Sequence, residues 1–296
     1  MISSASIEKA GMNSPYSDRA VSLPTPALRP FIARYAGFRA NGLPAGTHAG
    51  LPSRHVDLII SLGQPIHVIR MPNESLRPDA FTALVGGMKD APAIVRHDGD
   101  LYGMHLFLTP LGARAILGVS SVELASRVVH LSDLWGSAAG NLIERLMAAL
   151  TWQQRFAILD EEFMRRLIPI AMPREIAWAW GRLAQADGRV SIQGLARDLG
   201  WSRRHFSERF RTVLGVTPKT AARIFRFEHA CWLIKAERPS LAEAAYACGY
   251  HDQAHMTLEW NALAGCTPRS WILSELPFLQ DYELAASDDE RCRRPG

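Results

Sequence analysis

Residues 191–218 decide the fold of the second half of the chain, and they read SIQGLARDLGWSRRHFSERFRTVLGVTP. The same pattern returns at residues 240–268 as SLAEAAYACGYHDQAHMTLEWNALAGCTP. The offset is 49 positions up to the glycine turn and 50 positions after it, so the second copy has one extra residue in its turn. Self-similarity of this kind indicates that one supersecondary unit occurs twice.

Each copy carries the signals of two helices joined by a short turn. A glycine ends the first helix in a left-handed conformation, a polar N-cap starts the second helix, and a Thr-Pro pair starts a third. These signals are Gly200, Ser202 and Thr217-Pro218 in the first copy, and Gly249, Asp252 and Thr267-Pro268 in the second. We therefore predict two helix-turn-helix units, linked by a helix from Pro218 to about Ala236.

The helix after Ser202 has two chemically different faces. At about 100° per residue, its core face consists of Phe206, Phe210, Val213 and Leu214. The residues predicted to contact DNA are Ser202, Arg203, Arg204, Ser207, Glu208 and Arg211, with Lys219 and Arg223 further along the chain. Between residues 202 and 226 there are seven basic residues and one acid, a balance of +6 against +4 for the whole chain. This concentration is typical of a surface that contacts phosphates, with arginines at the helix start reaching base edges.

The equivalent helix of the second copy is uncharged on its outward face. Its core face consists of Met256, Trp260, Leu263 and Ala264. Its outward residues are Gln253, Ala254, Thr257, Leu258 and Asn261. Such a face can pair with adenine and contact thymine methyl groups, but its phosphate anchoring is weak. We therefore predict that the first copy supplies most of the DNA affinity.

A single helix-turn-helix pattern with a basic face has a simpler explanation than DNA binding, namely two packed helices whose basic side faces solvent. The full repeat, with matched caps, glycines and aromatic core positions, favours DNA binding over that explanation. His205 and His255 occupy equivalent places. We interpret both histidines as structural residues that pack beside the turn rather than as ligands.

The repeated residues resemble the DNA-binding domain of the AraC/XylS transcription regulators. The resemblance covers about residues 174–275 and rests on the glycine turns, the aromatic positions and both Thr-Pro pairs. It implies two helix-turn-helix units that insert their second helices into successive major grooves of bacterial promoter DNA. By position, it implies base readers at Arg203, Arg204, Ser207 and Glu208 in the first unit, and at Gln253, Ala254, Thr257 and Leu258 in the second. The second helix departs from the family pattern, which usually has Arg or Lys where Leu258, Asn261 and Ala262 stand and Phe where Met256 and Trp260 stand.

The first half of the chain is predicted to be rich in β-structure and to end in helices. Short apolar or alternating runs at 56–62, 65–70, 81–85, 93–96 and 101–108 are typical of strands. After residue 110, apolar residues recur at helical spacing, which predicts helices over 139–150 and 154–167. These helices either form a dimer interface or simply cover the β-domain, and the pattern favours neither.

The predicted fold class is therefore α+β multidomain, with a β-rich, cupin-like domain followed by an all-helical one. We expect a flexible tail over residues 1–20, a β-rich effector or sensor domain over 21–135, a helical connector over 136–170, a double helix-turn-helix domain over 171–276 and a tail over 277–296. Residues 51–59 and 129–136 resemble the cupin-like sensor domains that precede this DNA-binding module. The resemblance implies that the first half binds a small effector or dimerises.

No residue pattern in the first half recommends an enzyme. The strand-rich part before residue 110 contains five histidines: His48, His55, His67, His97 and His105. Their spacing lacks the His-x-His pair and following Glu of a metal-binding cupin, and no nucleophile elbow, zinc-protease helix or phosphate loop occurs. We expect no catalytic residue, no metal and no cofactor. Arg54, His55 and Asp57 either line an effector pocket or form a surface turn, and we favour the surface turn.

Composition sets the remaining limits. With 48% hydrophobic and 21% charged residues in 296 positions, the chain is close to an average globular protein, which excludes a disordered or fibrous one. No apolar run approaches the roughly 18 residues that span a bilayer, and no signal peptide is recognised, so we expect a cytoplasmic, nucleoid-associated protein without a membrane partner. The four cysteines stand singly, which suits a reducing compartment. We expect Cys231 and Cys248 to be buried thiols, with redox sensing as the alternative.

The sequence thus predicts a regulator of transcription. Its expected partners are double-stranded promoter DNA, a small-molecule effector, RNA polymerase and a second copy of the chain. The alternative is a small-molecule-binding protein or an enzyme whose helical domain is an interaction module. Salt-dependent binding to duplex DNA distinguishes the two hypotheses, because phosphate neutralisation makes affinity fall steeply with salt.

Overall fold

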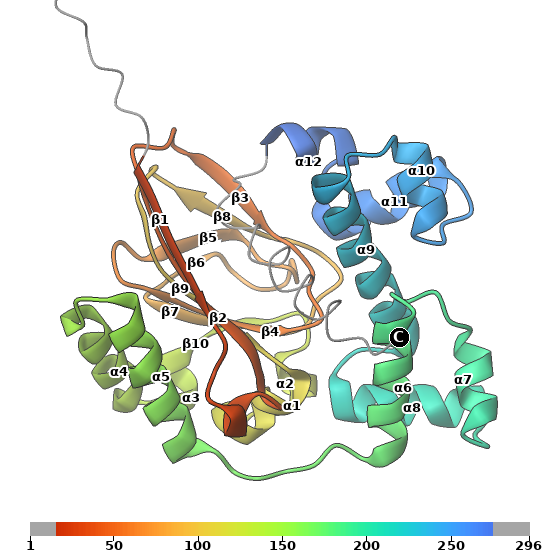
Figure 1. Cartoon of the computed structure of the whole chain (residues 1–296), viewed down its shortest axis with the longest axis horizontal. Coiled ribbons are helices and arrows are strands. Elements are labelled where there is room, and N and C mark those ends of the chain that lie inside the picture. Colours follow the sequence, from red (N-terminus) through yellow and green to blue (C-terminus); the bar gives the residue numbers. More distant parts are fainter. Residues whose placement is uncertain (1–15, 275–296) are drawn as a thin grey trace, which may run out of the picture.

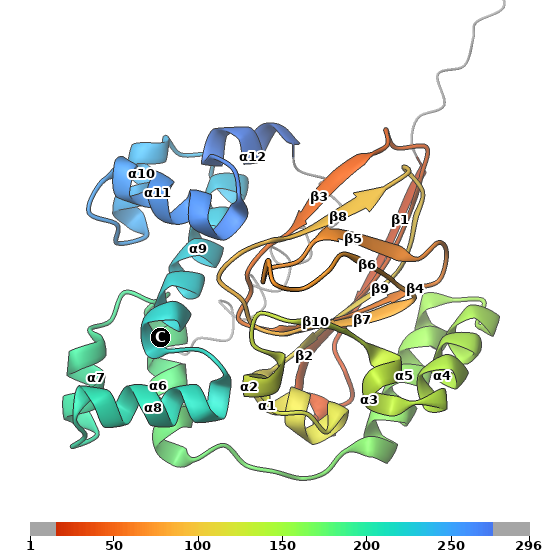
Figure 2. The same ribbon diagram turned by 180° about the vertical axis from the view of Figure 1, so that it is seen from behind.

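The computed structural model describes residues 16–274 and has a β-rich half and a helical half (Figure 1). The strands lie on one side of the molecule and the C-terminal helices lie on the other. A long extended segment connects the two halves along one edge (Figure 2). The predicted α+β multidomain class is confirmed.

Two antiparallel sheets make up the β-rich half. The first has six strands in the order β1-β2-β9-β4-β7-β10, and the second has four in the order β3-β8-β5-β6. The strands are β1 (Tyr16–Ser22), β2 (Ile32–Asn41), β3 (Gly46–Gly50), β4 (Val56–Ser61), β5 (Ile66–Arg70), β6 (Asp79–Phe81), β7 (Ala83–Gly86), β8 (Ala93–His97), β9 (Leu101–Leu108) and β10 (Val128–His130).

Successive side chains of the six-stranded sheet point to opposite faces, because a strand alternates with a period of two. Tyr35 of β2 pairs with Leu106 of β9, and both belong to the core that packs under helices. The neighbouring pair, Arg34 and Phe107, therefore points to the other face, toward the space between the two sheets. The interior of the β-domain thus receives charged as well as apolar side chains.

Helices cover the outer face of the six-stranded sheet (Figure 1). They are the short α1 (Pro110–Gly112), a π-helical turn (Ala113–Leu117), α2 (Ser121–Leu124), α3 (Leu131–Trp135), and the longer α4 (Ser137–Ala148) and α5 (Trp152–Arg166). The Phe156 ring of α5 stacks 5.9 Å from that of Tyr35. Trp152 lies over Gly37, where a Cβ atom would come within 2.3 Å of the indole ring, so this strand position requires glycine. The covering role of the helices is therefore shown, and dimerisation through them stays a prediction.

The N-terminal boundary of the β-domain was predicted wrongly. Residues 16–20 fall in the expected tail, yet they belong to β1, which pairs with β2 from Tyr16 to Ser22. The strand lies at the edge of the sheet and is stabilised by backbone pairing. Its sequence therefore has no continuous apolar run from which it could be predicted. β2 and β3 were also not predicted. The expected tails over residues 1–15 and 277–296 lie outside the described residues.

Between the connecting segment and residue 274, where the described part of the chain ends, the structure has seven helices. They are α6 (Arg174–Gln185), α7 (Ile192–Asp198), α8 (Arg203–Leu214), α9 (Pro218–Ala236), α10 (Leu241–Ala247), α11 (Gln253–Ala264) and α12 (Pro268–Ser274). Helices α7–α8 and α10–α11 are the two predicted helix-turn-helix units, and α9 joins them (Figure 1). Each predicted glycine turn has a positive φ, 68° at Gly200 and 74° at Gly249. Across residues 16–274, no helix is both long and apolar enough to cross a membrane.

The helical half has two hydrophobic cores, one on each half of α9. The first packs α6, α7 and α8 against Phe225, and it contains Phe206 and Phe210 at 0% exposure. The second packs α10, α11 and α12 against Phe227, and it contains Trp260 at 0% exposure. The predicted core faces of both second helices are therefore confirmed. The predicted burial of the Cys231 and Cys248 thiols is confirmed as well, and both belong to the second core.

Candidate nucleic-acid interface

Local capping and one close contact set the position of α8. The Ser202 hydroxyl accepts a hydrogen bond from the His205 backbone N–H at 3.2 Å, which satisfies one of the free amides at the helix start. Gly215 ends the helix with φ at 81°, and a Cβ atom there would lie 2.3 Å from the carbonyl oxygen of Ser121 in α2. The C-terminal end of α8 therefore rests against the β-rich half, and its N-terminal end carries the basic residues.

The predicted DNA-contacting residues of α8 lie on its solvent face. Arg203, Arg204, Glu208 and Arg211 are exposed and Ser207 is half-buried. The Arg204 side chain is 88% exposed and its Nε donates to the Glu208 carboxylate one turn away, at 2.9 Å. That hydrogen bond raises the pKa of Arg204. An exposed pair of this kind contributes little to stability, so Arg204 can leave Glu208 for another partner at low cost.

Two of the seven basic residues between 202 and 226 do not belong to the exposed basic surface. The guanidinium groups of Arg223 and Arg226 lie 3.4 and 3.2 Å from the carboxylate of Glu259 on α11. The other five are exposed: Arg203, Arg204, Arg209, Arg211 and Lys219. The contact of Glu259 with α9 was not predicted from the sequence. The only signal for it was that Glu259 stands at the edge of the uncharged outward face of its helix.

The predicted residues of α11 also lie on a solvent face. Gln253, Ala254, Leu258 and Asn261 are exposed, and Thr257 is half-buried. The Asp252 carboxylate caps the helix by accepting from the His255 backbone N–H at 2.7 Å. The structure therefore presents the second helices of both units to solvent, one basic and one uncharged.

The two equivalent histidines pack beside the turns, as predicted. The His205 ring meets Trp201 edge-on, with centroids 4.8 Å apart, and the His255 ring meets Tyr250 at 5.5 Å in the same way. The aromatic residue after each turn glycine is thus held by the histidine of the next helix. This contact couples the turn to the start of α8 and of α11.

Arg54 joins the β-rich half to α9, which corrects the expected surface turn. Its backbone N–H donates to Glu228 Oε1 at 2.8 Å, and its guanidinium lies 4.3 Å from the Phe225 ring centroid. The Arg54 and Glu228 side chains are 23% and 11% exposed. The expectation failed because the partner that buries Arg54 lies 174 positions away in the sequence.

His55 and Asp57 are also buried rather than in a surface turn. Asp57 lies 3.3 Å from the Lys89 ammonium and 3.0 Å from His105 Nε2. Burial alone would raise the pKa of Asp57, but Lys89 and the His105 hydrogen bond outweigh it and lower this pKa to about 2. Burial lowers the pKa of His55 well below its usual value, and the positive charge of Arg34 lowers it further. The interior of the β-domain therefore holds an ionised aspartate close to a histidine whose protonation is disfavoured, His55.

The stability of the β-domain is expected to fall in mild acid because of His48. Burial, with the nearby His97, His105 and Lys235, lowers the pKa of this half-buried histidine to about 4. Between about pH 6.5 and 4 the unfolded chain then binds a proton that the folded chain does not, so stability rises with pH across this window. Lowering the pH from 7 to 4 should remove about 3 kcal/mol of unfolding free energy through this group.

Urea unfolding of wild type and His48→Gln at pH 7 and pH 4.5 measures this effect. The variant should lose markedly less stability in acid than the wild type does. His251→Gln is the matched control, because His251 is 87% exposed and should leave the pH dependence unchanged. Equal acid sensitivity of His48→Gln and wild type would show that His48 is not responsible.

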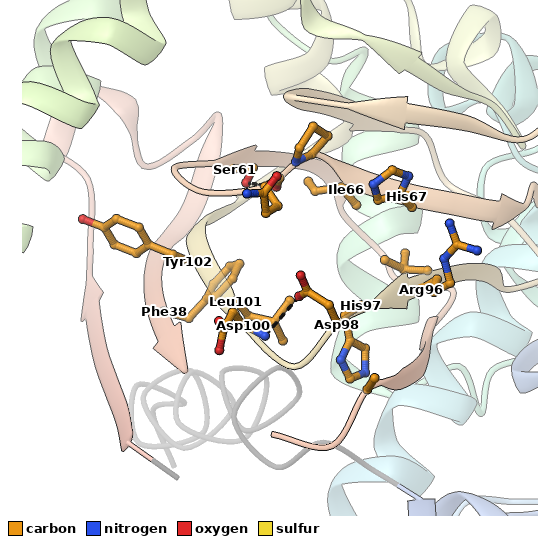
Figure 3. A pocket seen from close by; sticks show the side chains of 14 residues that line it. Phe38, Ser61, Ile66, His67, Arg96, His97, Asp98, Asp100, Leu101 and Tyr102 are labelled. Atoms are coloured by element: carbon orange, nitrogen blue, oxygen red, sulfur yellow. Dashed lines mark hydrogen bonds between the residues drawn. The ribbon is translucent and has the colours of Figure 1, made fainter. Parts of the chain in front are cut away.

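A cavity of roughly 400 Å³ opens between the two sheets (Figure 3). It is lined by Phe38, Ala45, Ser61, Gln64, Pro65, Ile66, His67, Val95, Arg96, His97, Asp98, Asp100, Leu101 and Tyr102. Phe38 and Ile66 face one another across it, whereas the Tyr102 ring points away, toward Arg155 (Figure 3). The cavity therefore combines an apolar middle with a polar rim from β8 and the turn after it.

His97 is one of the two buried polar residues that line this cavity, the other being Ser61. His97 is 9% exposed, and its Nδ1 atom has no hydrogen-bond partner within residues 16–274. Burial lowers the pKa of His97, which keeps the ring neutral near pH 7. A buried nitrogen without a partner is costly, so a ligand group that hydrogen-bonds to it would gain affinity there. The described residues contain no group of three or more His, Cys, Asp or Glu arranged to hold a metal ion.

Comparison with known proteins adds a domain assignment. A family model described as a helix-turn-helix domain matches residues 195–273. ToxT from Vibrio cholerae shares 9% identity over 88% of this chain and 98% of its own, with a TM-score of 0.48. ToxT solved with an unsaturated fatty acid bound shares 10% over 90% of this chain and 97% of its own, with a TM-score of 0.46.

A second solved protein is similar to part of the chain. The C-terminal domain of AraT, a response regulator from Geobacillus stearothermophilus, shares 18% identity over 36% of this chain and 90% of its own, with a TM-score of 0.34. A sequence comparison with curated proteins finds no match. The family model agrees with the caps, turns and cores of α7 to α12.

Proposed function

We propose that this chain is a DNA-binding regulator of transcription that inserts α8 and α11 into successive major grooves of promoter DNA. It carries an AraC-type helix-turn-helix domain over residues 195–273. The observation that carries the proposal is the exposed basic face of α8, the second helix of a helix-turn-helix unit. The second helix of such a unit contacts base edges with its N-terminal residues. Here those residues include Arg203 and Arg204.

The first unit is proposed to supply most of the affinity. The exposed cations of α8 and the start of α9 are Arg203, Arg204, Arg209, Arg211 and Lys219. Lys219 stands in the first turn of α9, where free backbone N–H groups also favour a phosphate. We assign Arg223 to the packing of α9 against α11, because its guanidinium faces Glu259. It therefore leaves the set of proposed phosphate contacts.

Replacing Arg204 by alanine should weaken specific DNA binding by about 1–3 kcal/mol, because a bidentate arginine–guanine contact would be lost. The fold should be unaffected, since the side chain is 88% exposed. Binding is measured by titrating full-length protein onto its operator duplex. Arg165→Ala is the matched control, because Arg165 is 63% exposed and pairs with a glutamate on its own helix, α5. Equal losses for the two variants would remove Arg204 from the base readers.

Footprinting of the full-length protein on the DNA upstream of its own gene, at two salt concentrations, locates the operator. Protection over about two helical turns that disappears at high salt is the expected result. Absence of all duplex binding at low salt would contradict the proposed function. It would favour the alternative, a small-molecule-binding protein whose helical domain serves interaction.

The cavity of the β-domain is proposed to take a small effector with a group that hydrogen-bonds to His97 Nδ1. The β-domain touches both helix-turn-helix units, since Met88 belongs to the first core and Leu51 packs on the second. A ligand that changes the packing of the sheets therefore has a physical route to both recognition helices. Dimerisation and contact with RNA polymerase stay predictions.

The effector proposal is tested by thermal unfolding of the protein with a panel of small hydroxylated and carboxylic compounds. A compound that binds the folded state raises the midpoint temperature. His97→Leu should abolish the shift, whereas His251→Leu, on an 87% exposed histidine, should preserve it. A shift that survives in His97→Leu would place the binding elsewhere.

A further inference from the structure

The outward face of α11 carries only two kinds of side chain, amides and groups that end in methyls. Its readers are two amides, Gln253 and Asn261, and three side chains that end in methyl groups, Ala254, Thr257 and Leu258. Leu258 is 71% exposed, which is unusual for leucine and leaves its methyl groups available for contact. This face contains no arginine, lysine or carboxylate.

Glu259, one of the two acids that flank this face, is turned inward, and Asp252, the other, caps the start of α11. The Glu259 carboxylate contacts Arg223, Arg226 and His255 at 3.4, 3.2 and 3.7 Å, and its side chain is 15% exposed. The contacts hold both arginines on α9 and keep the acid away from solvent. As a result, the outward face of α11 presents neither the cationic fork that reads guanine nor the carboxylate that reads cytosine, and the Asp252 carboxylate at the helix start is engaged by the His255 backbone N–H and the His251 ring.

We infer that the second recognition helix reads A·T base pairs only. The inference rests on the proposed function and names the sequence class of the second half-site. Asparagine and glutamine pair with the N6 and N7 atoms of adenine, and apolar side chains contact the thymine methyl group. The first unit has Arg203, Arg204 and Glu208, which suit G·C pairs. The operator is therefore asymmetric, with a G·C-containing half-site and an A·T-only half-site about one helical turn apart.

The position of α11 in the repeat favours DNA over a protein partner for this face. Helix α11 occupies the place in its unit that α8 occupies in the first, and both are second helices of a helix-turn-helix. Arg269, in the first turn of α12, stands 50 positions after Lys219 and is exposed like it. The second unit thus retains a phosphate contact beside its uncharged face. Ala254 and Thr257 are small enough to let the helix approach the bases closely.

The test is a binding selection with the purified full-length chain on duplexes whose randomised stretch exceeds two helical turns, about 21 base pairs. The expected product is a motif with conserved G·C pairs in one half and conserved A·T pairs in the other. A conserved G·C pair in the second half, or a second half of random sequence, would overturn the inference while leaving DNA binding in place. Failure to enrich any motif would contradict the proposed function itself.

Two variants connect the second half-site to α11. Gln253→Ala, at the first residue of α11, should weaken binding by about 5- to 150-fold on the selected operator, and much less on a duplex whose second half is scrambled. Leu258→Arg should change the preferred pair at one second-half position from A·T to G·C. Leu273→Ala, on a leucine that is 82% exposed on α12, is the matched control and should leave affinity and motif unchanged. Unchanged motifs for both α11 variants would show that this face does not read bases.

Discussion

Raising the salt concentration from about 50 to 200 mM is expected to weaken binding of the full-length chain to duplex DNA by roughly 100- to 1,000-fold. Each phosphate that a cation neutralises releases condensed counterions and adds about 0.9 to the slope of log affinity against log salt. Residues 202–226 expose five cations, Arg203, Arg204, Arg209, Arg211 and Lys219, and the first turn of α12 adds Arg269. If about four or five of these contact phosphates, a slope near −4 follows.

Charge-removing variants make this prediction specific. Lys219→Ala should lower the slope by about 1 and weaken binding on every duplex alike, because a phosphate contact carries no sequence information. Arg145→Ala removes the same charge from α4, where Arg145 is 40% exposed and paired with Glu161, and should leave the slope unchanged. A flat salt dependence of the wild type would mean that the basic face of α8 does not meet phosphates.

The helical half was predictable from sequence because its decisive interactions are local. The Ser202 cap reaches an amide three residues on, and Gly215 ends α8 with φ at 81°. Such signals lie within one turn of the residue that carries them. The repeat then doubled the evidence, since each cap and glycine of the first unit has a counterpart in the second.

The residues that were misjudged have partners far away in the sequence. Arg54 is held by Glu228, and Asp57 by Lys89 and His105, none of which is a sequence neighbour. Arg223 was counted among the phosphate contacts, yet it faces an acid 36 positions further on. Charge counting along a segment predicts the net charge of a surface but not which cations remain on it after packing.

The strands at the N-terminal edge were missed for a related reason. A strand at the sheet edge needs backbone pairing more than an apolar run, and β1 reads YSDRAVS. Its partner β2 contains Gly37, which the pattern marks as a break and the structure uses to seat Trp152. The cavity residues were missed as well, because His67 of β5 and Arg96 of β8 come together only through the pairing of these two strands.

Replacing Trp260 by alanine is expected to cost the second helix-turn-helix unit about 3–5 kcal/mol of stability. The indole is fully buried between the rings of Phe227 and Trp271, with centroids 4.9 and 5.1 Å away. Its Nε1 has no hydrogen-bond partner in the part of the chain that the structure describes, so the loss comes from packing and from the cavity left behind. Amide hydrogen exchange in α10 to α12 measures this loss directly, and exchange in α6 to α8 serves as the internal control.

The two separate cores make the functional consequence of this variant different from that of its counterpart, Phe210→Ala. Phe210 is fully buried in the first core, at the position that answers to Trp260 in the repeat. Because the first unit carries most of the cations, Phe210→Ala should abolish the whole footprint, whereas Trp260→Ala should remove only the half protected by α11. Equal loss from both variants would mean that the units fold as one body. Loss from Trp260→Ala alone would place the affinity in the second unit, against the charge distribution.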